Sequence, residues 1–509
     1  MSPTDPTPPA PAPAPAPVHT TVCIIGSGFA GLGMAARLRQ EGIDDLVLLE
    51  RAGSVGGTWR DNVYPGAACD IPSHLYSLSF DLNPDWEHTY ARQPEIRAYL
   101  EAVTDRHGLR SQVHFHAEVM HAAFDAETGR WRVETRDGRV FVARFLVSGV
   151  GALRDARFPE IPGMGRFDGP SMHSAEWDAT VELRGRRVGV IGTGASAIQL
   201  VPELAKEAGH LSVFQRTPSW VIPRHDEPYT DLQKAAFRHV PGLMRVNRLR
   251  LYLDRESRYP IAFGQWRFAA RGVERLLKWH IRRQISDPVL AAQMSPDYAL
   301  GCKRVLISND WYPAFARDNV TLETTGIAEV LPTGVRLADG RDVALDALVY
   351  CTGFKVDQPL GDMRLTGLDN QGLGELWGTR PRAWLGITVP GFPNAFLLLG
   401  PNTALGHNSV VVMIEAQIRY VLQAIRAATD LGERTYIDVD NKHLDEFLAW
   451  VDSRHEGQVW ASGCNSWYLS SEGENFTIWP GSTVSYVAKT RRFDLRRYTV
   501  GGTTGQPVR

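Results

Sequence analysis

Two short apolar runs along the chain have the pattern of buried parallel strands. Val22-Cys23-Ile24-Ile25 and Val188-Gly189-Val190-Ile191 contain no polar side chain, and each leads into a glycine-rich loop. A segment with the apolar period of a helix follows each loop, and the strand-like runs Leu46–Leu49 and Leu211–Phe214 follow those helices. This order predicts two βαβ units and therefore an α/β fold with two Rossmann-like dinucleotide-binding domains.

The pattern changes between Tyr229 and Ile285, where long helical periods carry many basic residues. We expect an inserted helical subdomain here, with its arginines on a solvated face. A basic amphipathic helix that lies on a membrane surface is the alternative explanation. The arginines are Arg245, Arg248, Arg250, Arg267, Arg271, Arg275, Arg282 and Arg283.

Length and charge limit the class of partner. At 509 residues the chain is long enough for two or three domains around a buried site. Lys plus Arg number 55 against 57 for Asp plus Glu, so no overall field attracts nucleic acid or an anionic membrane. We therefore expect small-molecule partners and no nucleic acid.

Cysteine usage and hydropathy indicate the compartment. The cysteines include no Cys-x-x-Cys pair and no zinc spacing, which favours free thiols in a reducing cytosol and no metal site. No apolar run reaches the roughly 18 residues that span a bilayer, and the N-terminus lacks the order of a signal peptide. We expect a soluble, cytoplasmic protein without an integral membrane span. The cysteines are Cys23, Cys69, Cys302, Cys351 and Cys464.

The first glycine loop has the features of a dinucleotide cradle. Gly26 permits a tight turn, Gly28 lets the backbone approach a pyrophosphate, and Gly31 allows the helix to pack closely. Glu50 ends the next strand, where a carboxylate accepts hydrogen bonds from a ribose. A glycine loop alone also occurs in ordinary turns, but the strand, helix and terminal acid together favour the cradle.

The second loop has the opposite charge at the ribose position. Its sequence is Gly192-Thr193-Gly194-Ala195-Ser196-Ala197, and its second strand ends in Gln215-Arg216-Thr217. The guanidinium of Arg216 pairs with a 2′-phosphate, whereas an acid repels one, so this loop should prefer NADP over NAD. The first cradle is then left for FAD. A surface arginine beside an ordinary glycine turn is the alternative.

Two dinucleotide folds are shared by several enzyme classes, so other residues must decide the reaction. Disulfide reductases need two neighbouring thiols beside the flavin, and the sequence has no such pair. A Gly-x-Ser-x-Gly elbow is absent, and His455-Glu456 is not followed by a histidine at metalloprotease spacing. Flavin reductases and flavin monooxygenases remain.

Two longer motifs identify the family. Residues 167–178 read Phe-Asp-Gly-Pro-Ser-Met-His-Ser-Ala-Glu-Trp-Asp and match the signature Phe-x-Gly-x-x-x-His-x-x-x-Trp-(Pro or Asp) of Baeyer-Villiger monooxygenases. The matched positions are Phe167, Gly169, His173 and Trp177. Residues 56–70, which include Thr58, Trp59 and Asp70, resemble the other motif of that family. The chain thus resembles Baeyer-Villiger monooxygenases from about Thr20 to Trp479.

The resemblance implies a reaction and two cofactors. NADPH reduces FAD, dioxygen adds to give a C4a-peroxyflavin, and the peroxide inserts one oxygen atom next to a ketone carbonyl to give an ester or lactone. Oxidation of sulfur or nitrogen centres is the nearest alternative, and a non-catalytic flavin-binding sensor is an alternative of another class. The sequence selects no single ketone and no oligomeric state.

The resemblance also implies roles for single residues. Arg304, a permanent cation, would stabilise negative charge on oxygen, and Asp70 would orient it. Lys303 would reach the NADP 2′-phosphate, and Trp59 and Tyr76 would lie against the flavin. The start of a helix at Asn408 and Ser409 would stabilise charge near flavin N1 through backbone amides. His173 would couple domain movement to turnover and would not act as a base.

Each role has a plainer structural alternative. Lys303 and Arg304 are also explained as a solvated basic turn, and Asp70 as a helix cap. Capping alone accounts equally well for Asn408 and Ser409, and Trp59 and Tyr76 are also typical core aromatics.

The expected domains follow from these motifs. They are a Pro/Ala-rich disordered tail (1–19), a first part of the FAD domain (20–155), a first part of the NADP domain (156–228), the helical insertion (229–299), a second part of the NADP domain (300–350), a second part of the FAD domain (351–490) and a C-terminal tail (491–509).

Overall fold

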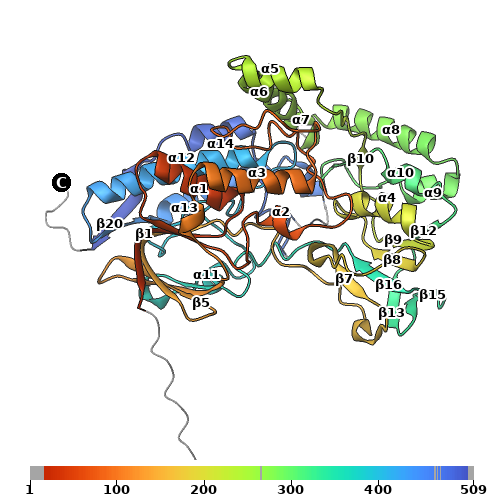
Figure 1. The fold of residues 1–509 in the computed structure, drawn as a ribbon, viewed down its shortest axis with the longest axis horizontal. Coiled ribbons are helices and arrows are strands. Elements are labelled where there is room, and N and C mark those ends of the chain that lie inside the picture. Colours follow the sequence, from red (N-terminus) through yellow and green to blue (C-terminus); the bar gives the residue numbers. More distant parts are fainter. Residues whose placement is uncertain (1–15, 264–265, 463–465, 467, 471, 503–509) are drawn as a thin grey trace, which may run out of the picture.

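The computed structural model describes residues 16–263, 266–462, 466, 468–470 and 472–502. Two lobes lie side by side (Figure 1); the first is built around a mixed sheet with a parallel core and the second around a parallel sheet. This arrangement confirms the predicted α/β class with two Rossmann-like units. The predicted N-terminal tail lies mostly outside the described residues, although strand β1 already begins at Val18.

The first sheet has the strand order β17-β4-β5-β6-β1-β2-β3, and β18 also pairs with β6. At its centre β1 runs parallel to both β2 and β6, with Ile24 opposite Leu48 and Val147. Strands β17 and β18 come from residues far beyond the rest of the sheet, so a late segment completes an early unit. The strands are β1 (Val18–Ile25), β2 (Leu46–Leu49), β3 (Val113–His114), β4 (Val119–Asp125), β5 (Arg130–Thr135), β6 (Val140–Ser148), β17 (Arg364–Thr366) and β18 (Ala395–Leu397).

The second sheet has the order β12-β9-β8-β16-β7, and all its pairings are parallel. Its strands are β7 (Ser171–His173), β8 (Arg187–Ile191), β9 (His210–Phe214), β12 (Val320–Glu323) and β16 (Ala347–Tyr350). Smaller pairings join β10 (Val221–Ile222) to β11 (Leu306–Ile307), β13 (Ile327–Leu331) to β14 (Gly334–Leu337) and β15 (Asp342–Ala344), and β19 (Thr435–Val439) to β20 (Tyr498–Gly502).

Helices cover both sheets. They are α1 (Phe29–Gln40), α2 (Thr58–Asp61), α3 (Gln93–Arg106), α4 (Ala197–Glu207), α5 (Asp231–His239), α6 (Leu243–Glu256), α7 (Tyr259–Ala262), α8 (Arg267–Gln284), α9 (Pro288–Gln293), α10 (Trp311–Ala314), α11 (Leu373–Trp377), α12 (Val410–Asp430), α13 (Asn441–His455) and α14 (Thr483–Lys489). Short 3-10 turns are η1 (Arg110–Gln112), η2 (Met164–Arg166), η3 (Ser174–Glu176), η4 (Leu368–Asn370), η5 (Val459–Ser462) and η6 (Leu495–Arg497).

The two lobes have separate apolar cores. In the first, Leu32 of α1 and Val411 of α12 are fully buried together with Ile24 and Leu48 of the sheet. In the second, α4 packs Leu200 and Val201 against the sheet. The predicted helical insertion contains α5 to α9, with α5 and α6 at the upper edge of the molecule and α8 and α9 at its right in Figure 1. No helix within the described ranges is long and apolar enough to cross a bilayer.

Two features differ from the sequence-based expectations. Residues 491–502, placed in a C-terminal tail, contain η6 and β20, and the buried Tyr498 hydroxyl lies 2.9 Å from that of Tyr420. Cys302 is disulfide-bonded, so the expectation of a free thiol is wrong for that residue. Cys23, Cys69 and Cys351 are free and buried, and Cys464 lies outside the described residues.

Candidate active site

The first glycine loop joins β1 to α1 and has the close packing that its glycines predict. A Cβ at Gly31 would lie 1.8 Å from the carbonyl oxygen of Gly26, so a larger residue there would push the helix away from the loop. Gly28 is the N-cap of α1, and no side chain caps the helix. The N-terminal amides of α1 are therefore left to a ligand, and the positive end of the helix favours a pyrophosphate.

Glu50 ends β2 and reaches into this loop. Its carboxylate accepts hydrogen bonds from the Ser27 amide at 3.1 Å and the Ser27 hydroxyl at 2.6 Å. Its other oxygen accepts from the Ala52 amide at 2.9 Å and pairs with Arg60 at 2.7 Å. The carboxylate is buried, and these partners fix it where the ribose contact was predicted. Sequence analysis did not single out Arg60.

The second glycine loop joins β8 to α4. Gly192 has a φ of +115°, and a Cβ there would lie 2.4 Å from the Cys351 carbonyl oxygen, so glycine is required at this turn. The Thr193 hydroxyl donates to the Thr217 carbonyl at 2.9 Å, which ties the loop to the end of β9. Gly194 faces open space, and Ser196, the N-cap of α4, makes no side-chain capping bond. This cradle therefore also fits a phosphate-bearing ligand.

Two cations lie near the end of β9. Arg216 is exposed directly after β9, and Lys303 packs with its Nζ 4.9 Å from the centre of the Tyr298 ring. Burial lowers the pKa of Lys303, and the charge of Arg216 lowers it further. Two mutually repelling cations beside a nucleotide cradle are suited to a doubly charged phosphate.

Asp70 and Arg304 form an ion pair, although 234 positions separate them in the sequence. Asp70 Oδ2 accepts a hydrogen bond from Arg304 Nε at 2.8 Å, and Nη2 lies 2.6 Å from the same oxygen in the ion pair. Nη1 donates to the Leu405 carbonyl at 3.3 Å. The Arg304 side chain is 28% exposed, so it remains partly open to a ligand. The charge of Asp70 raises the pKa of Arg304, against the opposing effect of burial, and the guanidinium stays charged.

Trp59 and Tyr76 lie beside the first cradle. Trp59 follows Thr58 in α2, its Nε1 donates to the Tyr76 hydroxyl at 3.2 Å, and the two rings meet edge to face. Both side chains are only partly buried, as expected for aromatics that also contact a ligand. Their contact with the flavin stays a prediction.

The loop that carries Asp70 is docked on α4 of the other lobe. The Tyr64 hydroxyl donates to Gln199 Oε1 at 2.9 Å, and Gln199 Nε2 donates to the Ala68 carbonyl at 2.9 Å. These bonds connect the first-lobe motif to the helix of the second cradle. Tyr64 belongs to the predicted family motif of residues 56–70, but nothing in the sequence links it to Gln199, for which no role was predicted.

Asn408 and Ser409 are fully buried at the start of α12. Asn408 Oδ1 accepts from the Ser409 amide at 2.8 Å, and the Ser409 hydroxyl accepts from the Val411 amide at 3.3 Å. The Ser409 side chain caps α12, and the predicted role of the two backbone amides at the flavin stays a prediction. The amide of Asn408 donates to Glu256 of the helical insertion at 2.9 Å.

Glu256 is a site residue that the sequence did not reveal. Burial would raise its pKa, but hydrogen bonds from His407, Thr483 and Asn408 lower it to about 2, so the carboxylate is ionised. His407 Nε2 lies 3.4 Å from Glu256, and its side chain is only 1% exposed. Leu405 lies two residues before His407, and its carbonyl accepts a hydrogen bond from Arg304. The insertion thus braces the loop beside Arg304.

The family motif lies at the end of β7. His173 is fully buried, its Nδ1 accepts from the Ala175 amide at 3.0 Å, and its ring packs edge to face on Phe158. Burial lowers its pKa to about 4, against a smaller opposing effect of the Gly353 backbone. Phe167 and Trp177 are half-buried against the cores of the second lobe. Gly169 lies in the loop between Phe167 and β7.

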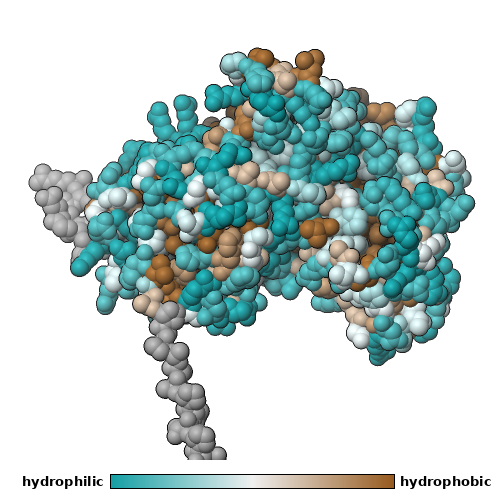
Figure 2. All heavy atoms as spheres, in the orientation of Figure 1, coloured by the Kyte–Doolittle hydropathy of each residue, from teal (hydrophilic) through white to brown (hydrophobic). Residues whose placement is uncertain are grey.

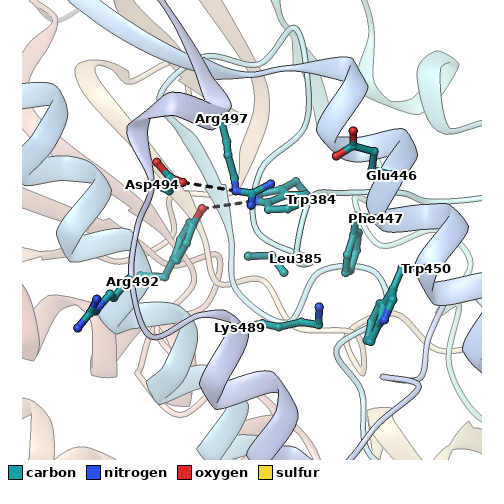
Figure 3. A pocket seen from close by; sticks show the side chains of 10 residues that line it. Trp384, Leu385, Glu446, Phe447, Trp450, Lys489, Arg492, Asp494 and Arg497 are labelled. Atoms are coloured by element: carbon teal, nitrogen blue, oxygen red, sulfur yellow. Dashed lines mark hydrogen bonds and ion pairs between the residues drawn. The ribbon is translucent and has the colours of Figure 1, made fainter.

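A separate pocket of about 310 Å³ lies between α13 and α14 (Figure 3). Trp384, Phe447 and Trp450 form its aromatic walls, and no predicted site residue lines it. Its cations already lie over these rings: Lys489 Nζ is 4.0 Å from the centre of a Trp450 ring, and Arg497 is 5.2 Å from a Trp384 ring. We interpret this pocket as structural.

Comparison with known proteins defines the class. Residues 23–252 match the family described as "Pyridine nucleotide-disulphide oxidoreductase", which agrees with two dinucleotide folds in one chain. A Baeyer-Villiger monooxygenase of Streptomyces coelicolor is 45% identical over 95% of this chain and 93% of its own length. One of Pseudomonas aeruginosa is 42% identical over 94% of this chain and 91% of its own length.

Solved structures agree. A steroid monooxygenase bound to NADP superposes with a TM-score of 0.84 at 31% identity, covering 96% of this chain and all of that one. A closed cyclohexanone monooxygenase superposes with a TM-score of 0.87 at 28% identity, with the same coverage. Fold and site define a flavoprotein oxidoreductase with two nucleotide cradles. Within that class the chain belongs to the Baeyer-Villiger monooxygenases.

The buried His173 predicts a pH dependence of stability. Its pKa is lowered from 6.5 to about 4. Between these two values the imidazole is protonated in the unfolded chain but stays neutral in the folded protein. This contribution lowers stability as pH falls from 6.5, by about 2 kcal/mol at a pH near 5. His173→Gln should therefore show a smaller fall in Tm between about pH 7 and 5 than the wild type, as measured by scanning calorimetry. Parallel curves for the two proteins would contradict the assignment.

Proposed function

We propose that this protein is an NADPH- and dioxygen-dependent flavin monooxygenase that performs Baeyer-Villiger oxidation, inserting one oxygen atom beside a ketone carbonyl. The relatives named above support the reaction, and the two cradles support FAD and NADPH as its cofactors. When bound, the cofactor pair supplies a hydride and activates dioxygen. The remaining steps depend on what the residues of this chain do.

The Asp70–Arg304 pair is the observation that carries the proposal. Oxygen insertion next to a carbonyl places negative charge on oxygen, and a fixed guanidinium stabilises that charge better than water does. Arg304 keeps its proton because Asp70 lies 2.6 Å away and raises its pKa. Asp70 and the Leu405 carbonyl together hold the guanidinium in one orientation. A sensor without turnover would need no such pair.

The first cradle would hold FAD. Gly26, Gly28 and Gly31 shape the loop below the pyrophosphate, and Glu50 is already fixed at the ribose end. Trp59 and Tyr76 would pack against the ring system, and Thr58, the first residue of α2, would also contact the cofactor. The uncapped N-terminus of α1 supports this assignment.

The second cradle would hold NADPH. The loop of residues 192–197 would receive the pyrophosphate, and the hydrogen bond from Thr193 to the Thr217 carbonyl fixes this loop. Arg216 and Lys303 would both bind the 2′-phosphate. NADH has no 2′-phosphate, so these contacts would favour NADPH. The lowered pKa of Lys303 supports a close approach of the two cations.

We also propose the domain division expected from the sequence, with the FAD domain split between residues 20–155 and 351–490 and the NADP domain split around the insertion at 229–299. The pairing of β17 and β18 with the first sheet, and of β12 and β16 with the second, supports it.

Isotope labelling tests the reaction. Protein incubated with NADPH, a panel of ketones and ¹⁸O₂ should form an ester or lactone that carries one labelled oxygen, detected by mass spectrometry. Labelled sulfoxide or N-oxide from sulfide and amine substrates, with no ester from any ketone, would favour the heteroatom alternative. If no ketone increases the rate of NADPH consumption, the result would support the alternative of a non-catalytic flavin-binding sensor.

Replacement of the fixed cation tests the mechanism. Arg304→Ala should lower the rate of ester formation by roughly a hundred- to a thousandfold, because one preorganised donor is lost. Arg317→Ala, which removes an exposed arginine outside the site, should leave the rate unchanged. If gas chromatography shows that Arg304→Ala forms ester at the wild-type rate, the proposed role of Arg304 in stabilising charge is wrong.

The coenzyme clamp predicts a selective effect. Arg216→Gln should raise the KM for NADPH by roughly ten- to a hundredfold, since one charge-assisted contact with the 2′-phosphate is lost. The KM for NADH should change little, and steady-state kinetics with both coenzymes provide the internal control. If the KM rises equally for NADPH and NADH, Arg216 supports the local structure and does not bind the 2′-phosphate.

A further inference from the structure

The helical insertion exposes an unusual share of large apolar side chains. Of the fifteen large hydrophobic residues that are strongly exposed in the described part of the chain, ten belong to residues 229–299. In Figure 2 a few brown atoms show at the top of the molecule, over α5 and α6. The ten are Leu232, Val240, Val246, Leu249, Leu253, Trp266, Phe268, Leu276, Trp279 and Val289. A soluble surface rarely concentrates apolar area in this way.

On two helices these residues follow the helical period and form stripes. On α6 they are Val246, Leu249 and Leu253, spaced by three and four positions. On α8 they are Phe268, Leu276 and Trp279, with exposures of 92%, 59% and 53%. We call these two sets of residues the apolar stripes.

The stripes lie on the outer faces, because the opposite faces are anchored in the protein. On α6, Arg248 donates to the carbonyls of His74, Leu75 and Ser77 at 2.8–3.0 Å. On α8, Ala270, Leu277 and Ile281 are buried. Each helix therefore already packs on the protein through its other face. The stripes face outward and are not part of the core.

Arginines flank the stripe of α8 with no acid to balance them. Arg267, Arg271, Arg275, Arg282 and Arg283 are all exposed. The ion pairs of the insertion, within the described residues, lie on α5, on α6 and in the turn after α6. The one acidic side chain of α8, Glu274, instead accepts a hydrogen bond from the Leu300 amide at 2.8 Å. The overall charge balance of the chain thus conceals a local cationic surface.

We propose that the apolar stripes and their arginines bind the surface of an anionic lipid bilayer. Aromatic and aliphatic side chains of such a helix enter the boundary between headgroups and acyl chains, while arginines extend to lipid phosphates. The 18 residues of α8 extend about 27 Å, which suits a flat surface. A second copy of this chain is a poor partner for this surface, because a symmetric contact would bring the arginines of α8 from both copies together.

The helical insertion also contacts the candidate active site. Glu256 at the end of α6 bonds Asn408, and the Phe263 ring that follows α7 packs on His407 at 5.4 Å. Lipid binding would therefore place the loop beside Arg304 close to a reservoir of apolar compounds. The binding itself does not depend on the proposed reaction, and its test uses no turnover.

Vesicle flotation with the full-length, flavin-loaded protein tests the proposal. The protein should float with vesicles of phosphatidylcholine mixed with phosphatidylglycerol, and it should not float with phosphatidylcholine alone. Binding should weaken as salt increases. Phe268→Ser combined with Trp279→Ser, and separately Arg271→Gln combined with Arg275→Gln, should each lower the partition coefficient by about tenfold or more.

Matched controls change exposed residues elsewhere. Leu153→Ser with Val18→Ser, and Arg166→Gln with Arg184→Gln, should float like the wild type; these side chains are exposed outside the insertion. A wild-type protein that stays with the soluble fraction in the presence of phosphatidylglycerol would overturn the proposal, as would binding that both stripe variants retain. Size-exclusion chromatography adds a third outcome: a dimer that the Phe268 and Trp279 changes dissolve, without lipid binding, would make the surface a self-interface.

Discussion

The ion pair between Asp70 and Arg304 constrains the whole architecture, because its two members come from different lobes. Asp70 ends a loop of the first lobe that is fastened to α4 through Tyr64 and Gln199, and Arg304 is held from the other side by the Leu405 carbonyl. The guanidinium therefore keeps its position only while both lobes, the motif loop and the loop before α12 stay in register. A guanidinium that several independent elements fix in advance needs little reorganisation when charge develops beside it.

The fold was predictable where its determinants are local. The strands at Val22 and Val188 and the glycine loops after them appear as expected, since apolar runs and turn glycines act over a few residues. The pairing of β17 and β18 with the first sheet, and the β20 strand in a presumed tail, depend on contacts made across the fold. No local pattern encodes such partners, and the Cys302 disulfide escaped prediction for the same reason.

The candidate site divides in the same way. Sequence motifs placed Asp70, Arg304 and Glu50 because each belongs to a recognisable segment, and the structure brings the first two within 2.6 Å. Glu256 and Gln199 were missed because an acid in an arginine-rich helix, or a single amide in α4, has no distinguishing neighbourhood in the sequence. At Asn408 and Ser409 the predicted helix start is confirmed, since Ser409 is the N-cap of α12, but the role of their backbone amides at the flavin stays a prediction.

The interleaved strand order affects how the chain acquires its structure during synthesis. The internal strand β16 of the second sheet, which pairs with β8 and β7, begins only at residue 347, so neither sheet is complete when the helical insertion leaves the ribosome. The second lobe can close once that strand emerges, whereas the first lobe must wait for β18 and α12. For much of translation, the nascent first cradle therefore exposes the apolar faces that α12 later buries, and the lobe encoded first is the last to mature.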